Sequence, residues 1–435
     1  MLKSLIKKII FYDKIYFLLK DSFIYESWKK SMGQLANTIY GYPSKKFFVI
    51  GITGTNGKTT TANLVHTILN EHVAKTLMIS TANIKIGNQD LPNTKKMTSL
   101  DVLDLQSILA TAKDSWCKIA VLEVSSHGLD QYRFEGVDFD FAVLTNITHD
   151  HLDFHGTFDR YAQSKEKLFT YVLSNKKQNK YASFPADDKI WRQRFEDMPF
   201  DKKLSYSITA SSSLKAENIQ ISAAWTTFSL IYLGKPYAIT TKLVGEFNVY
   251  NILAALSVVL QMGVDIDQAI STIASFETVT GRMEHIEKNG INCFVDFAHT
   301  PDALDKTLDY LNQIKWSGRL ITVFWATGNR DKTKRPIMGE IAGKYSDILI
   351  ATDDDPDIEN RLEILAQLTS NITKKKLNKD LFVLPERILA IKFACEIAQP
   401  GDVLMFAGKG HETVQYTNFS KRKWSDREEI LKNLK

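Results

Sequence analysis

The stretch FFVIGITGTNGKTTTANLVHTILNEH, residues 47–72, is the part of the sequence that says most about the fold. Its first seven residues, Phe47–Thr53, are apolar and predict a buried strand, whereas the residues from Thr59 onward predict a helix. Between them lies a glycine-rich turn ending in Lys-Thr, whose backbone N–H groups can form an anion site at the helix N-terminus. The stretch therefore predicts an α/β domain that binds the phosphates of a nucleotide.

The phosphate loop departs from the standard spacing G-x-x-x-x-G-K-[ST], because Ile52 stands five positions before Gly57. The flanking strand and helix still supply the context such a loop needs, and a purely structural glycine turn is the alternative. Lys58 would neutralise the β- and γ-phosphates, and the hydroxyl of Thr59 would bind Mg²⁺. The residues expected to bind the nucleotide here are Gly54, Thr55, Asn56, Gly57, Lys58, Thr59 and Thr60.

Beyond the loop, short apolar runs alternate with helical stretches. TLMIST, KIAVLEVSS and DFAVLTNI predict further strands, which favours a mostly parallel sheet covered by helices. Residues 205–245 are rich in Thr and Ser and predict antiparallel hairpins, followed by a helix over about 249–262. A second α/β series, with strands at CFVDFAH, RLITVFWA, DILIATDDD and DVLMFAGKG, follows a predicted boundary near residue 285.

The composition is that of a globular protein: 44% hydrophobic, 24% charged, with a mean hydropathy of −0.19. A chain of 435 residues is too long for one ordinary core, so two or three domains are expected. The net charge of +5 is mild and lies largely in the first thirty residues, so it does not indicate nucleic-acid binding. Three widely spaced cysteines exclude a disulfide scaffold or zinc ribbon and suit a reducing cytoplasm.

Residues 1–30 are basic and apolar. The longest apolar run between charges is Ile15–Leu19, too short to span a bilayer, and no small-residue cleavage site indicates a cleaved signal peptide. Apolar residues recur every three or four positions from Leu2 to Phe23, which predicts one amphipathic helix. Two interpretations stay open: the helix docks on the rest of the protein, or it lies on the inner face of a membrane.

Candidate metal ligands follow two of the predicted strands. Glu123 is expected at the carboxyl end of a strand, where it could hold Mg²⁺; a helix cap or surface ion pair is the alternative. His149, His151 and His155 in THDHLDFH would ordinarily suggest zinc. No nearby cysteine or H-E-x-x-H pattern supports that metal.

Together these motifs resemble the Mur ligases, which use ATP to join amino acids to a peptidoglycan precursor. The MurE type, which adds the third residue of the stem peptide, is the most similar. The motifs cover most of residues 51–428 and are GITGTNGKTTT, LEVSSHGLDQYR, LTNITHDHLDFHGTFDRYAQSKEKLF, GEFNVYNILAA, GRMEHI, DFAHTPDAL, GNRDKTKRP and AGKGHET. The resemblance implies a central P-loop ATPase domain over 46–285 and a Rossmann-like C-terminal domain over 286–435 for the incoming amino acid. An N-terminal amphipathic helix and linker would occupy 1–45.

The resemblance also implies a catalytic set of Lys58, Glu123, His151 and Lys165. His151 would contact a second Mg²⁺, and Lys165 falls on the family's carbamylated lysine, whose CO₂ adduct is a carboxylate that can bind metal. The implied metal ligands are thus Thr59, Glu123, His151 and carbamylated Lys165. From the residues alone, Lys165 and Lys167 would be assigned to a solvated helix face.

Further ATP contacts are implied in both domains. Asn248 and Asn251 would flank the adenine, with capping or surface asparagines as the alternative. Phe297 replaces a family tyrosine, and Trp325 and Ala326 stand where the family usually has glycine. The polar candidates here are Arg282, Asp296, His299, Arg330 and Lys334.

The peptide substrate would be gripped by Ser125, Gln131 and Arg133, because an arginine and two neutral donors suit a carboxylate-rich peptide. Gly408 and Glu412 match the family's positions for the amino-acid end of the acceptor. The implied substrate-binding residues are Thr98, Ser99, Ser125, Gln131, Arg133, Asp354, Asp355, Asp357, Gly408 and Glu412.

The segment ATDDDPDIEN bears on the acceptor. Diaminopimelate-adding MurE proteins carry Asp-Asn-Pro-Arg, and alignment on Pro356 places Asp357 on the arginine. A carboxylate there would repel a distal carboxylate and attract a distal ammonium, so lysine or ornithine is expected in preference to diaminopimelate. The alternative is that Asp353, Asp354, Asp355 and Asp357 form a solvated acidic loop or helix cap.

Only about fifty residues precede the phosphate loop, so we expect most of the family's UDP-binding domain to be missing. Two carriers stay open: the UDP-muramyl peptide, and a different, lipid-linked carrier met at the membrane surface. The substrate carboxylate would attack the γ-phosphate, and the amino acid's amine would then attack the acyl phosphate.

The expected protein is therefore a monomeric, ATP- and Mg²⁺-dependent carboxylate–amine ligase of the cytoplasm, with membrane contact through residues 1–30 as an open interpretation. One alternative is folylpolyglutamate synthase, against which GKTTT, EVSSHGLDQYR and GRMEHI argue. The other is a non-catalytic ATP-binding scaffold for wall-synthesis enzymes. The intact Lys58, Glu123, His151 and Lys165 argue against such a decayed site.

Overall fold

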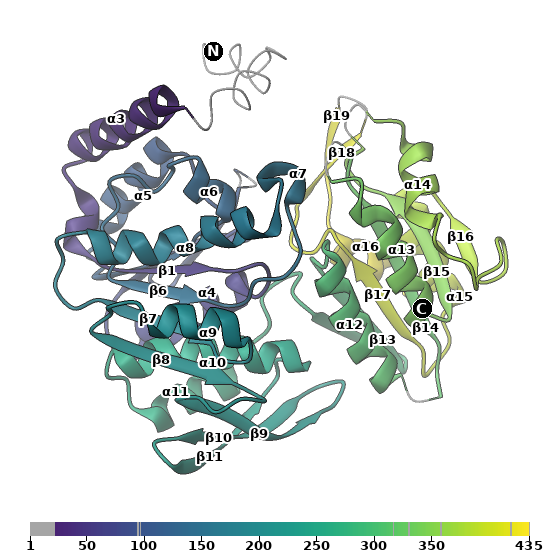
Figure 1. Cartoon of the computed structure of the whole chain (residues 1–435). Coiled ribbons are helices and arrows are strands. Elements are labelled where there is room, and N and C mark those ends of the chain that lie inside the picture. The colour runs from purple at the N-terminus through teal and green to yellow at the C-terminus, as the bar shows by residue number, and fades with distance from the viewer. Residues whose placement is uncertain are drawn as a thin grey trace.

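The computed structural model describes residues 22–93, 95, 97–315, 317–328, 331–356, 359–417 and 420–434. Two large sheets organise these residues, each with helices packed against it (Figure 1). The first sheet has eleven strands in the order β11-β10-β9-β8-β7-β6-β1-β5-β2-β3-β4. The second has six strands in the order β12-β13-β17-β14-β15-β16, and β18 and β19 pair separately.

The first sheet is parallel through its middle and antiparallel at both edges. Strands β9 through β2 pair in parallel, whereas the pairs β2–β3, β3–β4, β9–β10 and β10–β11 are antiparallel. This arrangement confirms the predicted α/β class and the antiparallel hairpins over residues 205–245. The strands are β1 (Phe48–Thr53), β2 (Thr76–Ile79), β3 (Asn83–Ile86), β4 (Gln89–Pro92), β5 (Ile119–Glu123), β6 (Phe141–Leu144), β7 (Tyr181–Pro185), β8 (Lys202–Ser207), β9 (Leu214–Ile221), β10 (Thr226–Tyr232) and β11 (Lys235–Thr241).

Strand β1 is apolar throughout because both of its faces are covered. Val49 belongs to the core that includes α5 and α8, whereas Ile50 and Ile52 belong to the core that includes α4 and α10. A parallel strand between two helical layers has no solvent-facing side, so it shows no polar alternation. The helices are α4 (Lys58–His72), α5 (Val102–Asp114), α6 (Ser126–Asp130), α7 (Leu152–His155), α8 (Phe158–Ser174), α9 (Lys189–Glu196), α10 (Glu246–Gln261) and α11 (Ile266–Ser275).

The second sheet is parallel except for its edge strand β12. Its helix α12 begins at Pro301, where the side chain of Thr300 accepts a hydrogen bond from the backbone N–H of Ala303. The strands are β12 (Glu284–Lys288), β13 (Ile291–Asp296), β14 (Leu320–Ala326), β15 (Ile348–Asp353), β16 (Leu381–Val383) and β17 (Val403–Ala407), with β18 (Val414–Thr417) and β19 (Ser420–Lys423) apart. The helices are α12 (Pro301–Ile314), α13 (Lys334–Tyr345), α14 (Arg361–Thr369), α15 (Arg387–Ile397) and α16 (Asp426–Asn433).

The first described element is helix α3 (Phe23–Ile39), followed by a short 3₁₀ helix at Pro43–Lys46. Most of the amphipathic helix predicted from Leu2 lies outside the described residues. Residues 23–39 are helical, and Gly33 and Ala36 are buried where α3 packs on the body of the protein. Among the described residues, the helices all fall short of the length and apolarity that a bilayer crossing requires.

A buried ion pair fastens the C-terminal helix to the second sheet. The guanidinium of Arg387 donates to both carboxylate oxygens of Asp426, at 2.8 and 2.5 Å, and neither side chain is exposed. The indole N–H of Trp424 donates to the same carboxylate at 2.8 Å. Asp426 therefore both neutralises the buried Arg387 charge and holds α16 against α15.

We expect Asp426→Ala to lower the free energy of unfolding by about 3–5 kcal/mol, because it leaves the Arg387 charge buried without its partner. Arg427→Ala is the matched control, since it removes a pair to Glu284 in which Arg427 is 51% exposed. That variant should change stability by less than about 1 kcal/mol. Urea unfolding of both variants checks this, and equal losses would contradict it.

Candidate active site

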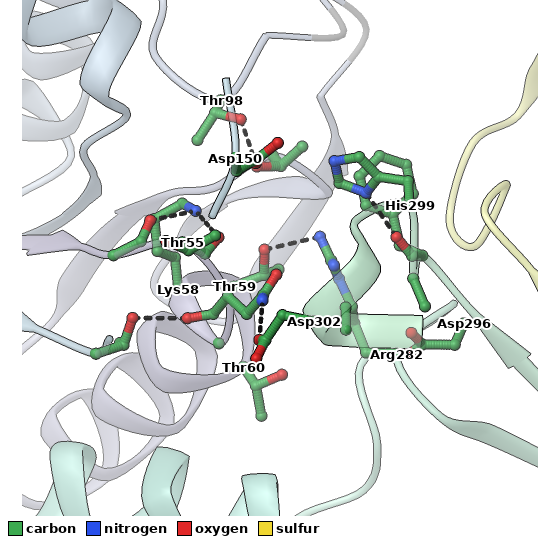
Figure 2. A pocket seen from close by; sticks show the side chains of 18 of the residues that line it. Thr55, Lys58, Thr59, Thr60, Thr98, Asp150, Arg282, Asp296, His299 and Asp302 are labelled. Carbon is green, nitrogen blue, oxygen red and sulfur yellow. Dashed lines mark hydrogen bonds between the residues drawn. The ribbon is translucent and has the colours of Figure 1, made fainter. Parts of the chain in front are cut away.

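A cleft of about 1450 Å³ draws its walls from both sheets (Figure 2). Of the predicted site residues, Gln131, Asp354 and Gly408 do not line it, while Arg330 and Asp357 lie outside the described residues. Residues predicted from segments up to 358 positions apart are thus brought to one place. Those that line the cleft are Gly54, Thr55, Asn56, Gly57, Lys58, Thr59, Thr60, Thr98, Ser99, Glu123, Ser125, Arg133, His151, Lys165, Asn248, Asn251, Arg282, Asp296, His299, Lys334, Asp355 and Glu412.

The phosphate loop connects β1 to the N-terminus of α4. Gly57 has φ +85°, and a Cβ there would lie 2.1 Å from the side-chain oxygen of Asn251, so only glycine fits. The Lys58 ammonium folds back over the loop and donates to the carbonyl oxygens of Gly54 at 2.9 Å and Thr55 at 2.8 Å. Burial lowers the pKa of Lys58. The loop thus presents a cation and the helix N-terminus to the same space.

Glu123 ends β5 and is almost fully buried beside the loop. The backbone N–H and the hydroxyl of Thr81 lie 3.2 and 2.9 Å from its two carboxylate oxygens. The Thr81 hydroxyl also lies 2.9 Å from the hydroxyl of Thr98, which ties a predicted substrate residue to this carboxylate. A fixed carboxylate with oxygen neighbours is a donor set that suits Mg²⁺.

Lys165 is buried on α8, and its ammonium nitrogen donates to the carbonyl oxygen of Gly54 at 2.8 Å. Burial, and then the charge of Lys58, lowers the pKa of Lys165 well below its ordinary value. The solvated helix face inferred from the residues alone is therefore wrong for Lys165. It holds for Lys167, whose side chain is 46% exposed and pairs with Asp130.

His151 stands at the start of α7, with its Nε2 atom 3.2 Å from a carboxylate oxygen of Asp150. Burial in the cleft, and then the charge of Lys165, lowers the pKa of His151 to about 2. The imidazole is therefore neutral at pH 7 and able to ligate a cation. His155 is buried nearby between Asp130 and Ser126, as a structural residue would be.

Two contacts join the phosphate loop to the second sheet's side of the cleft. The guanidinium of Arg282 donates to the hydroxyl of Thr59 at 3.0 Å, and the side-chain amide of Asn56 donates to Asp302 at 2.8 Å (Figure 2). Asp302 occupies the first turn of α12. Side chains from the loop before β12 and from α12 therefore reach across the cleft to the phosphate loop.

The polar wall on the second sheet's side of the cleft consists of half-buried side chains. Burial raises the pKa of Asp296 to about 6, although the charge of Arg282 opposes the shift. Burial, and then Lys334, lowers the pKa of His299 to about 4, so this imidazole is neutral at pH 7. The Lys334 ammonium donates to the carbonyl oxygen of His299 at 2.9 Å.

Asn248 and Asn251 face the interior from α10, so their alternative as surface asparagines is wrong. The amide of Asn251 donates to the side-chain oxygen of Asn248 at 2.9 Å, and the amide of Asn248 donates to the carbonyl oxygen of Val244 at 2.8 Å. This chain of hydrogen bonds fixes both side chains behind the phosphate loop.

Three carboxylates gather around Lys409 at the other end of the cleft. Its ammonium nitrogen lies 2.8 Å from Asp354, 3.2 Å from Asp355 and 2.8 Å from Glu412. Burial opposes the Lys409 charge, but these carboxylates outweigh it and raise the pKa of the amine. Burial raises the pKa of Asp354 to about 8.

The solvated acidic loop considered for this segment is wrong for two of its residues. Asp354 is fully buried on Lys409, and Asp353 is buried on Arg361. Gly408 lies behind the cleft, where φ is +98° and a Cβ would collide with the indole of Trp325. It therefore shapes the wall without lining it.

Sequence reasoning missed four residues that position the site. Thr81 holds Glu123, Asp150 contacts His151, Asp302 holds Asn56, and Lys409 offsets part of the charge of three carboxylates. A signal existed for Asp150, Asp302 and Lys409, which stand inside the quoted motifs THDHLDFH, DFAHTPDAL and AGKGHET. Thr81 carried no such signal, because its partner is distant in sequence.

Family comparisons agree with this geometry. The Mur ligase middle domain matches residues 52–259, and the Mur ligase glutamate ligase domain matches residues 281–410. The chain belongs to the Mur ligase family. A relative from Caldanaerobacter subterraneus subsp. tengcongensis, named UDP-N-acetylmuramoyl-L-alanyl-D-glutamate–2,6-diaminopimelate ligase, is 39% identical over 391 residues, which are 90% of this chain and 78% of that protein.

Solved structures place this Mur ligase in the same group. One of a UDP-N-acetylmuramoyl-L-alanyl-D-glutamate–2,6-diaminopimelate ligase has a TM-score of 0.62 at 32% identity, over 89% of this chain and 78% of that one. Folylpolyglutamate synthase from Mycobacterium tuberculosis has a TM-score of 0.71 at 18% identity, over 87% and 92% of the two chains, which shows a shared fold alone. This Mur ligase is an ATP-dependent amide ligase of the MurE type.

Proposed function

We propose that this Mur ligase uses ATP and Mg²⁺ to join an amino acid to the carboxylate of UDP-N-acetylmuramoyl-L-alanyl-D-glutamate in peptidoglycan synthesis. One observation carries the proposal: Lys58, Glu123 and Lys165 line the same cleft as Arg282, Asp355 and Glu412. The names of the relatives support the muramyl substrate. The roles proposed for residues 46–285 and 286–435 are ATP binding and amino-acid binding.

The proposed reaction passes through an acyl phosphate. A carboxylate oxygen of the peptide attacks the γ-phosphorus, the bond to the β-phosphate oxygen breaks, and ADP forms. The amine nitrogen of the amino acid then attacks the acyl carbon, phosphate leaves, and the nitrogen loses a proton. Lys58 and Arg282 would offset charge on the transferred phosphoryl group. Closure of the two sides on each other, which the Asn56–Asp302 contact links, would keep water from the intermediate.

The metal sites proposed for this cleft use Thr59, Glu123 and His151. Bound Mg²⁺ would supply positive charge at the transferring phosphoryl group. We further propose that Lys165 is carbamylated, with its nitrogen bonding to CO₂ and releasing one proton. Its burial and lowered pKa support this, because only a neutral amine reacts with CO₂.

We propose lysine or ornithine as the incoming amino acid, selected by Asp357. The position of Asp357 in DDDPD supports this, as do the carboxylates of Asp355 and Glu412 on the cleft wall. A second ammonium would be attracted there, whereas a second carboxylate would be repelled. Diaminopimelate is the competing candidate, since it is the amino acid named for the relatives.

We also propose that the protein acts as a monomer in the cytoplasm, where ATP is supplied. The experiment that tests the proposed function is phosphate release from ATP with Mg²⁺ and UDP-N-acetylmuramoyl-L-alanyl-D-glutamate. Lysine, ornithine or diaminopimelate is added separately. Stimulation by any of them supports the ligase. No stimulated phosphate release with any of the three amino acids, while ATP still binds, would contradict the proposed ligase. It would favour another carrier on the peptide or a non-catalytic scaffold.

The same assay tests the selector. We expect Asp357→Arg to shift the ratio of kcat/KM for lysine over diaminopimelate by at least about tenfold toward diaminopimelate, because one charge near the distal group is reversed. Glu363→Arg makes the same charge change at an exposed position of α14 and should leave the ratio unchanged. A wild-type preference for diaminopimelate would overturn the selector and keep the enzyme class.

A further inference from the structure

Helix α3 carries an apolar stripe on its outer face. Ile24, Trp28, Leu35 and Ile39 are 74, 50, 53 and 62% exposed. At about 100° per residue, they fall within about 60° of the helix circumference. The opposite side, which packs on the protein, is formed by the buried residues Gly33, Ala36 and Asn37. The helix therefore presents apolar side chains to solvent on the side opposite the one that packs on the protein.

The surroundings of the stripe are basic and aromatic. Residues 22–46 contain four lysines and a single acidic residue, Glu26. The ammonium of Lys29 lies 5.0 Å from the ring of Trp28, and Lys45 lies 4.4 Å from the ring of Tyr42. The preceding segment leads directly into α3 and adds further charge, with lysines at Lys3, Lys7, Lys8, Lys14 and Lys20 against Asp13 and Asp21.

We propose that α3 docks through this stripe on an anionic lipid surface. Exposed apolar side chains, a tryptophan and a tyrosine each near a lysine, and an excess of basic residues are what such a surface selects. A second copy of the chain is a poorer occupant. The stripe runs about 22 Å along one helix, whereas a stable protein interface needs about 800 Å² from each partner.

Docking would bring lipid close to the substrate end of the cleft. Gly33 of α3 packs on Glu135, and Asn37 packs on Gly136, close in sequence to the cleft residue Arg133. In Figure 1 the helix lies beside α5, at the edge of the first sheet's half of the molecule. The nearness of lipid to the substrate rests on the proposed function. Lipid binding itself does not, because it is measured without substrate.

The test is sedimentation of the full chain with vesicles of phosphatidylglycerol and phosphatidylcholine, and with phosphatidylcholine alone. We expect binding to the anionic vesicles that weakens with salt, and we expect W28E/L35E to weaken it at least about tenfold. The matched control is I190E/L233E, which places two glutamates at isolated positions that are 76 and 80% exposed. That control should bind as the wild type does.

Three results would overturn the proposal. They are equal binding by W28E/L35E and the wild type, equal binding to neutral vesicles, and a wild-type dimer in light scattering that W28E/L35E dissociates. Melting temperature shows that both variants fold. Phosphate release with the UDP-linked substrate should be the same for both variants. A loss of lipid binding with turnover intact therefore separates this inference from the proposed function.

Discussion

Lys58→Met is expected to lower ATP turnover by at least about 10³-fold, because it removes the cation that would meet the transferring phosphoryl group. The Lys58 ammonium lies 2.9 and 2.8 Å from two carbonyl oxygens of the phosphate loop, which fixes its place. Methionine keeps the length and the apolar stem of the side chain. Single-turnover phosphate release with saturating amino acid measures the loss.

The control is Lys189→Met, which makes the same change at an exposed position of α9. It should retain turnover within about twofold, since surface substitutions away from the site are nearly neutral. Melting temperatures of both variants without nucleotide separate folding from function. Retention of turnover by a folded Lys58→Met protein would contradict the assignment of the phosphate loop.

Lys165→Ala is expected to lower turnover by about 10²–10³-fold, because the proposed carbamate carries part of the charge that organises the metal. A short carboxylate such as acetate should partly restore activity, since the truncated side chain leaves space for it beside Gly54. Lys167→Ala is the control on the same helix, where the side chain is 46% exposed. Failure of every carboxylate to restore activity, or an equal loss in the control, would contradict a carbamate.

The same lysine has a consequence for stability. Without bound CO₂, the pKa of the Lys165 amine is lowered in the folded protein, so the unfolded chain binds more protons between the folded and unfolded pKa values. Stability therefore rises with pH through that window, up to the ordinary lysine value. Lys165→Met should raise stability at neutral pH and flatten this dependence in urea unfolding. Lys165 would then be a residue that is kept for its function although it lowers the stability of the fold.

The central strands and the phosphate loop could be predicted because their signals are local. Strand β1 is apolar on both faces, and the Gly57–Lys58 turn sits between a strand and a helix, so a short window of sequence suffices. Lys165 shows the limit of such windows. Its neighbours give a polar helix, yet the side chain is buried because it reaches Gly54, 111 residues away.

The contacts between the two sides of the cleft could not be predicted from the sequence, for the same reason. Asn56 and Asp302 are separated by 246 residues and belong to opposite sides of the cleft. Asp354 looked like part of a solvated acidic run, and its burial depends on Lys409 arriving from the end of another strand. Local sequence patterns predict the helices and strands, whereas the tertiary fold decides which charged side chains from different elements meet.

In the proposed reaction, ATP activates the carboxylate of the peptide substrate. Labelling the substrate carboxylate with ¹⁸O and analysing the released phosphate by mass spectrometry tests it most directly. An acyl phosphate transfers one carboxylate oxygen to phosphate, so one ¹⁸O per turnover is predicted, together with an equal amount of amide product. Unlabelled phosphate would mean that water attacks the γ-phosphate, and this result would contradict an acyl-phosphate intermediate.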